Sequence, residues 1–238
     1  MGPGFERTAR IAGSILLVTA AALGLACRSR DETRTPLPAA SSSLERPVSA
    51  RAPDGRPRIV VLGDSLTAGL GLPPELAYPT LLQQRIDREG LPFSVVNAGV
   101  SGDTSAGGLS RLDWALEGNV RVLVVALGGN DGLRGLPVDE LKRNLSAIIE
   151  RAQARQIRVV LSGMEAPTNF GQEYTAAFHS VYPELARRYS VPFVPFLLQG
   201  VAGVESLNQR DGIHPTAEGA RLVADNVWSV LGHTLETP

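Results

Sequence analysis

Apolar residues along the chain fall into short continuous runs that alternate with stretches of helical spacing. Runs typical of strands buried on both faces lie at 59–62, 93–97, 120–127, 158–162 and, more weakly, 192–196. Between and after them, apolar residues recur every three or four positions, as at Leu141, Leu145, Ile148, Ile149, Ala152, and again at Ala220, Val223, Ala224, Val227, Trp228, Leu231. Strands that alternate with helices favour right-handed crossovers and a parallel sheet. The pattern therefore predicts an α/β fold, a three-layer α/β/α sandwich with a central parallel sheet.

The N-terminus has a different pattern, with two arginines before an apolar run at 11–26. A basic start and a run shorter than the roughly 20 residues of a spanning helix predict a signal peptide over residues 1–27. Its end, Gly24-Leu25-Ala26-Cys27, resembles a bacterial lipobox, although Gly24 stands where Leu is usual. Lipidation of Cys27 and an ordinary signal peptide are both open. Either places the mature protein outside the cytoplasm, periplasmic or associated with the cell envelope, and lipidation would attach it to a membrane.

Residues 28–57 contain almost no large apolar side chain and are rich in Arg, Ser, Ala and Pro. Such a segment cannot bury enough surface to offset the entropy of ordering it, so we expect a disordered linker. The folded domain is then predicted at 58–232, followed by a C-terminal tail at 233–238.

Composition narrows the class of ligand. The 238 residues are 43% hydrophobic and 20% charged, with a formal net charge of −1. Nucleic-acid binding needs a dense basic surface, so we expect no nucleic-acid partner and favour a small molecule or a lipid. The single cysteine excludes an internal disulfide framework and a cysteine-based zinc site, and three histidines give little support to a zinc cluster.

Four polar motifs follow predicted strands or precede the last helix: Gly63-Asp64-Ser65-Leu66, Asn97-Ala98-Gly99-Val100-Ser101-Gly102-Asp103-Thr104, Gly128-Gly129-Asn130-Asp131 and Asp211-Gly212-Ile213-His214-Pro215. Ligands of open α/β sheets bind at the carboxyl ends of strands, so the motifs point to one site. Taken singly, the first three also suit a helix cap, a glycine-rich turn and an Asx turn.

Each motif can supply one part of an acyl-transfer site. Ser65 on a tight turn after a strand suits a nucleophile, and the Gly102 backbone can approach a bound carbonyl closely. The Asn130 amide can stabilise an oxyanion. Asp211 and His214, three residues apart, can hold the imidazole in the tautomer that accepts a proton from serine. The other two histidines, His179 and His233, are predicted to be surface or packing residues.

Together the four motifs resemble those of the GDSL esterases, the SGNH hydrolase superfamily. The sequence is similar to the bacterial branch of periplasmic acyl-CoA thioesterase, lysophospholipase and arylesterase enzymes, over Arg58 to about Leu231. The resemblance implies a flavodoxin-like fold. It also implies a catalytic triad of nucleophile Ser65, base His214 and orienting Asp211.

For the oxyanion hole, the resemblance implies the backbone N–H groups of Ser65 and Gly102 and the side chain of Asn130. The expected substrate-binding residues are Leu136, Glu165 and Phe170, where Leu136 and Phe170 are equally compatible with ordinary loop packing. Many relatives carry Arg where Glu165 stands, so the reversed charge leaves substrate preference open.

The expected activity is that of a serine esterase that hydrolyses carboxylic esters or thioesters of acyl substrates through an acyl-enzyme. No metal or organic cofactor is needed for this chemistry. One alternative is a carbohydrate O-acetyl esterase, which preference for acetyl over longer acyl groups would indicate. The other is a non-catalytic lipid-binding envelope lipoprotein, which would not react with a serine-directed probe.

Overall fold

The computed structural model describes residues 55–236, so the predicted signal peptide, Cys27 and nearly all of the predicted linker lie outside the described residues. The strands are β1 (Arg58–Gly63), β2 (Ser94–Gly99), β3 (Val120–Ala126), β4 (Arg158–Ser162) and β5 (Phe193–Val194). They form one parallel sheet in the order β2-β1-β3-β4-β5. This is the flavodoxin-like order, and the predicted fold class is confirmed.

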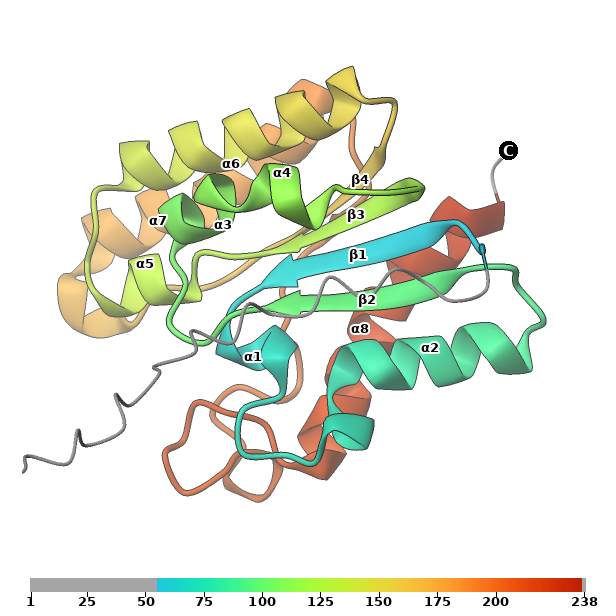
Figure 1. The fold of residues 1–238 in the computed structure, drawn as a ribbon. Helices are drawn as coiled ribbons and strands as arrows, with labels where there is room; N and C mark the ends of the chain where they lie inside the picture. Colours follow the sequence, from blue (N-terminus) through green and yellow to red (C-terminus); the bar gives the residue numbers. More distant parts are fainter. Residues whose placement is uncertain (1–54, 237–238) are drawn as a thin grey trace, which may run out of the picture. The chain divides into compact units, whose positions relative to one another are not determined.

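Helices cover both faces of this sheet, which makes three layers (Figure 1). One face carries α2 (Tyr78–Arg88) and α8 (Ala217–Glu236), and the other carries α6 (Val138–Ala154) and α7 (Gln172–Tyr189). Shorter helical segments follow the strands and fill the loops: α1 (Ser65–Ala68), α3 (Ser105–Ser110), α4 (Leu112–Ala115), α5 (Gly129–Leu133), and the 3₁₀ turns η1 (Pro74–Leu76), η2 (Thr168–Phe170) and η3 (Glu205–Leu207).

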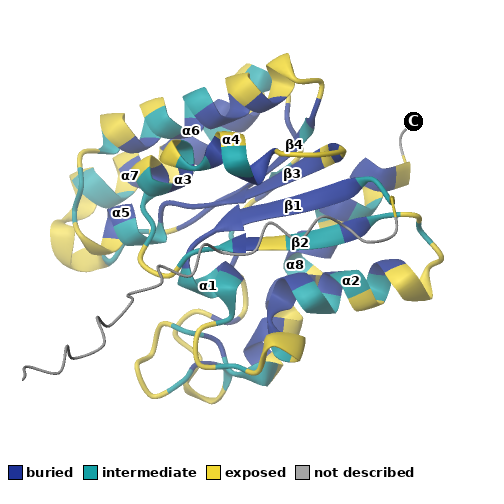
Figure 2. Ribbon diagram, viewed as in Figure 1, coloured by how far each residue is buried: buried dark blue, intermediate teal, exposed yellow. Residues whose placement is uncertain are grey.

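The core lies on both faces of the central strands. All six residues of β1 are buried, and so are all residues of β3 except Arg121 (Figure 2). Strands covered on both sides by helices bury every side chain, which is why they appear in the sequence as continuous apolar runs. The apolar stripe predicted on α6, from Leu141 to Ala152, is also buried.

The last helix is longer than the sequence predicts. Thr234 and Leu235 are buried, and α8 continues to Glu236, through positions where the sequence predicts a tail. The burial of Leu235 explains the extension, because an apolar side chain against the core stabilises one more helical turn. Among residues 55–236, no helix is long and apolar enough to cross a bilayer.

The strand order fixes where a ligand can bind. The chain runs from β1 to β2 on one side of it, and the next connection crosses to β3 on the other side, so the strand order reverses at β1. This reversal leaves a crevice at the carboxyl end of β1, where open α/β sheets bind their ligands.

Candidate active site

Ser65 is held on a tight turn at the carboxyl end of β1. It is the first residue of α1, and the Asp64 side chain caps this helix by accepting the Leu66 N–H at 3.0 Å. A Cβ on Gly63 would lie 1.9 Å from Thr67 Oγ1 and 2.9 Å from the Ala126 carbonyl oxygen, so only glycine fits there. The sequence therefore brings the first turn of α1 directly against the end of the sheet.

The His214 loop is organised by Asp211. One carboxylate oxygen of Asp211 accepts the N–H groups of Ile213 and His214, each at 3.0 Å. The other lies 2.7 Å from His214 Nδ1. The loop is joined to the α1 side of the site by Gln209, whose backbone N–H donates to the His214 carbonyl and whose side chain donates to the Leu70 carbonyl.

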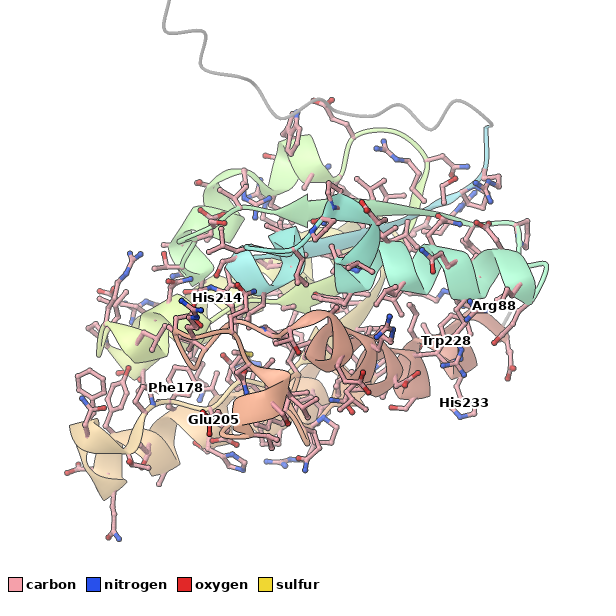
Figure 3. All side chains as sticks on the ribbon, turned by 90° about the horizontal axis from the view of Figure 1, so that it is seen from below. Arg88, Phe178, Glu205, His214, Trp228 and His233 are labelled. Carbon is pink, nitrogen blue, oxygen red and sulfur yellow. The ribbon has the colours of Figure 1, made fainter. Side chains whose placement is uncertain are left out.

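Folding brings Ser65 and His214 together from positions 149 residues apart, with Nε2 2.9 Å from Oγ. Because Nδ1 faces a carboxylate, it carries the ring proton, and Nε2 is left to accept the serine proton. The His214 side chain is 16% exposed, whereas that of Asp211 is 46% exposed. Figure 3 shows His214 at the opposite end of the fold from His233.

Asp211 is ionised well below neutral pH. The N–H groups of His214 and Ile213 and the His214 ring lower the pKa of its carboxyl from 3.8 to about 2. Hydrogen bonds donated to a carboxylate favour the charged form. Asp211 therefore presents a stable negative charge to the imidazole across the range in which a histidine can work.

The backbone of Gly102 lies in the turn after β2. The Asp103 N–H donates to the Val100 carbonyl at 3.1 Å, and Gly102 has a φ of +85°. A positive φ at the third position of such a turn favours glycine, which explains why this residue type stands beside the site.

The Asn130 side chain reaches the same place from α5. Its Nδ2 donates to the Asp103 carbonyl at 2.9 Å and to Asp64 Oδ2 at 3.3 Å. Both neighbours are acceptors, so the orientation of the amide is determined. The longer contact leaves the second amide hydrogen weakly held and available to a substrate oxygen.

Asp64, adjacent to Ser65, is a buried carboxyl that is only 3% exposed. Burial raises its pKa from 3.8 to about 6, although the Leu66 N–H, the nearby His214 and the Asn130 amide oppose that rise. Loss of hydration disfavours the charged form of a carboxyl. A carboxyl with a pKa of about 6 thus directly precedes Ser65 in the chain.

A cleft of about 440 Å³ opens beside Ser65 and His214. Gly102, Asn130 and Ser101 also line it, so the sequence-predicted nucleophile, base and oxyanion donors share one cavity. Much of the remaining wall is apolar: Leu66, Leu70, Leu133, Met164, Ala166, Pro167, Phe196, Leu198, Ala202 and Ile213.

Only one of the three predicted substrate-binding residues lines the cleft. Glu165 lines the cleft, whereas Leu136 and Phe170 do not. The Leu136 carbonyl accepts the Tyr174 hydroxyl at 2.9 Å, and the Phe170 ring lies 5.4 Å from that of Tyr174. Leu136 and Phe170 thus contact Tyr174, and their part in substrate binding stays a prediction, whereas Leu133 lines the cleft.

His179 and His233 are both exposed, as predicted. The sequence does not reveal that His179 Nδ1 lies 2.6 Å from Oε1 of Glu165, on the edge of the cleft. The two residues are 14 positions apart in different elements, so no local pattern connects them. Among residues 55–236, no cluster of three or more His, Cys, Asp or Glu side chains is arranged to hold a metal ion.

Comparison with known proteins assigns this arrangement to a family. The profile of the GDSL-like Lipase/Acylhydrolase family matches residues 61–222, which include every motif of the cleft. The chain belongs to this family. Esterase TesA of Pseudomonas aeruginosa is 44% identical over 174 residues, which cover 73% of this chain and 87% of the relative.

Two further relatives broaden the comparison. Thioesterase 1/protease 1/lysophospholipase L1 of Escherichia coli is 39% identical over 168 residues, covering 70% of this chain and 79% of the relative. The crystal structure of the psychrotrophic esterase EstA from Pseudoalteromonas sp., inhibited by monoethylphosphonate, superposes with a TM-score of 0.72. It is 33% identical and covers 76% of this chain and 99% of that one. The chain is accordingly a GDSL-family hydrolase of ester bonds, of the esterase and thioesterase type, as the sequence predicts.

Proposed function

We propose that Ser65, His214 and Asp211 are the catalytic triad of this hydrolase. The observation that carries the proposal is the continuous hydrogen-bond chain from Asp211 Oδ2 to His214 Nδ1, 2.7 Å, and from His214 Nε2 to Ser65 Oγ, 2.9 Å. A nucleophile in contact with a base that is itself oriented by a carboxylate is the arrangement that acyl transfer requires.

In the proposed reaction, Ser65 Oγ forms a bond to the acyl carbon as its proton passes to His214 Nε2. The tetrahedral intermediate collapses when the protonated His214 gives that proton to the departing alcohol or thiol. A water molecule then attacks the acyl-enzyme, with His214 accepting its proton, and the carboxylic acid leaves as Ser65 recovers its hydrogen. Asp211 stabilises the imidazolium of each half-reaction.

The backbone N–H groups of Ser65 and Gly102 and the Asn130 amide donate hydrogen bonds to the negatively charged oxygen of the intermediate. Asn130 is suited to this role because the Asp103 carbonyl already fixes its amide plane. Donors held in place before the reaction need no reorganisation as charge develops, which makes them effective.

We propose a substrate whose acyl chain is longer than acetyl. It is an aryl ester, a thioester or a lysophospholipid. The apolar wall formed by Leu133, Phe196 and Leu198 supports this choice, since an acetyl group would leave it unoccupied. Initial rates on nitrophenyl esters of increasing length test it. A clear optimum at acetate would refute the proposal and favour the O-acetyl esterase.

We further propose an extracytoplasmic location, with Cys27 as the point of lipid attachment. The basic and apolar N-terminus and the sequence Gly24-Leu25-Ala26-Cys27 support this. Mass spectrometry of the mature N-terminus checks it directly. An unmodified first residue other than Cys27 would exclude the lipid anchor and leave an ordinary signal peptide.

A fluorophosphonate probe tests the triad. Wild-type protein is expected to bind one equivalent covalently and Ser65→Ala none. Ser101 also lines the cleft, so Ser101→Ala is the matched control, and it should still bind one equivalent. Wild-type protein that stays unlabelled would refute the triad and favour the non-catalytic lipid-binding protein, and a label on Ser101 would refute Ser65 as nucleophile.

A further inference from the structure

Behind the cleft, a single guanidinium joins two of the loops that form the site. Arg111, between α3 and α4, donates from Nη2 to the Gly63 carbonyl at 2.8 Å and from Nε to Asp103 Oδ2 at 2.6 Å. The side chains of Arg111 and Asp103 are 16% and 18% exposed. Neither residue lines the cleft.

The first contact fixes the loop of the nucleophile. Gly63 ends β1 two positions before Ser65, and its carbonyl also accepts the Val100 N–H at 3.0 Å. Arg111 thus contacts the point at which the end of β1 is already joined to the turn after β2.

The second contact fixes the loop of Gly102. Asp103 directly follows Gly102, and its carbonyl is the acceptor that holds the Asn130 amide. On the other side, a Cβ on Gly107 would lie 2.7 Å from Asp103 Oδ1, so the first turn of α3 packs tightly against this carboxylate. Asp103 therefore transmits the position of Arg111 to two proposed oxyanion donors.

We propose that Arg111 is a positioning residue for the oxyanion hole. Its guanidinium sets the separation between the Ser65 loop and the Gly102 loop, and through Asp103 it sets the Asn130 amide. Arg111 touches no substrate. This inference rests on the proposed function, because it assigns Arg111 to the same three donors.

The chemistry of arginine supports a geometric role over a merely stabilising one. The planar guanidinium holds two acceptors on different loops at fixed angles, whereas the ammonium of lysine also has several N–H donors but sits on a flexible stem and imposes no such geometry. A largely buried ion pair adds little net stability, because desolvation offsets the attraction. Arg111 Nη1 is also buried with no hydrogen-bond partner among the described residues, a further cost of keeping the group there.

The test measures turnover per active site in Arg111→Gln and Arg111→Lys. Active sites are counted by the endpoint of fluorophosphonate labelling, and kcat and KM are measured on nitrophenyl butyrate. Displaced donors stabilise the transition state less well, but they change the binding of the substrate little. In Arg111→Gln, kcat should therefore fall by about thirtyfold to a hundredfold while KM changes less than about twofold. Arg111→Lys should recover part of the loss.

A matched control is the buried Arg58, at the other end of β1, which donates to the Glu117 carbonyl at 2.9 Å. Arg58→Gln is expected to lower the melting temperature and leave kcat per labelled site unchanged. A kcat per site equal to wild type in Arg111→Gln, with only the folded fraction reduced, would overturn the proposal.

If Arg111→Gln does not fold, Asp103→Asn provides the second variant, because it keeps the shape of the side chain and removes the ion pair. Its kcat per site should fall in the same direction, and wild-type turnover would refute the role of Arg111. Failure of the triad is distinguishable, since unlabelled wild-type protein refutes Ser65, whereas failure of this inference leaves wild-type labelling intact.

Discussion

The free energy of unfolding should depend on pH through Asp64, the buried residue that precedes Ser65. Its buried carboxyl has a pKa of about 6, whereas the ordinary pKa of an exposed aspartate is 3.8. Asp64→Asn removes the titrating group yet keeps an oxygen that can accept the Leu66 N–H, so the cap on α1 is retained. The variant therefore isolates the cost of burying charge.

The sign of the effect follows from the raised pKa. Between about pH 4 and pH 6 the folded protein holds the Asp64 proton more tightly than the unfolded chain does, so the free energy of unfolding falls as pH rises through this window. The full cost is present above about pH 6 and absent below about pH 4. A displacement from 3.8 to about 6 corresponds to roughly 3 kcal/mol.

Urea unfolding of both proteins at about pH 4 and about pH 8 measures this cost. Relative to wild type, Asp64→Asn should gain roughly 3 kcal/mol more at the higher pH than at the lower. Asp139→Asn, on the exposed start of α6, controls for the loss of one negative charge. Equal differences between Asp64→Asn and wild type at the two pH values would refute the reasoning.

Three further predictions concern the site and its support. Asn130→Ala should lower kcat by about a hundredfold or more, because one oxyanion donor is lost, and steady-state kinetics that match wild type would remove Asn130 from the site. Gly99→Ala would place a Cβ 2.2 Å from the Ala68 nitrogen, so a loss of about 3 kcal/mol is expected in urea unfolding, whereas the open, positive-φ Gly90→Ala should lose only about 1 kcal/mol. Glu165→Gln removes a negative charge from the cleft. At low salt, the ratio of kcat/KM for an anionic acyl-CoA to kcat/KM for a neutral ester should therefore rise by about twofold or more. An unchanged ratio would show that Glu165 does not select by charge.

The central strands were predictable because burial on both faces leaves a signature in the sequence itself. The fifth run was less so. The apolar pattern covers 192–196, yet β5 contains only Phe193–Val194. Pro192 and Pro195 flank these two residues and have no N–H to donate to a neighbouring strand, which accounts for the short pairing.

The local chemistry of the site was also predictable, since Asp211 and His214 are close in sequence and act within one loop. Their distance from Ser65 was not, because it depends on how the last loop packs against the first. The wall of the cleft shows the same limit. Residues 129–133 form α5, and this helix brings Leu133 to the cleft, whereas Leu136 does not line it. A glycine-rich motif gives little sign of a helix.

Contacts made by long polar side chains between elements were the hardest to foresee. Arg111 connects the end of β1 with the turn after β2, and His179 on α7 meets Glu165 in the loop after β4. Neither pair lies on a common periodic face, so hydrophobic spacing carries no information about it.

The separation of 149 residues between Ser65 and His214 has a consequence during synthesis of the chain. A nascent chain that ends before Gln209 already contains Ser65, Gly102 and Asn130, but it lacks His214 and the Gln209 side chain that donates to the Leu70 carbonyl. Contacts of such long range form late, because the intervening chain must be closed first. If the proposed triad is correct, a chain that ends before His214 is expected to be inactive toward esters, and activity requires the last loop to dock against the first.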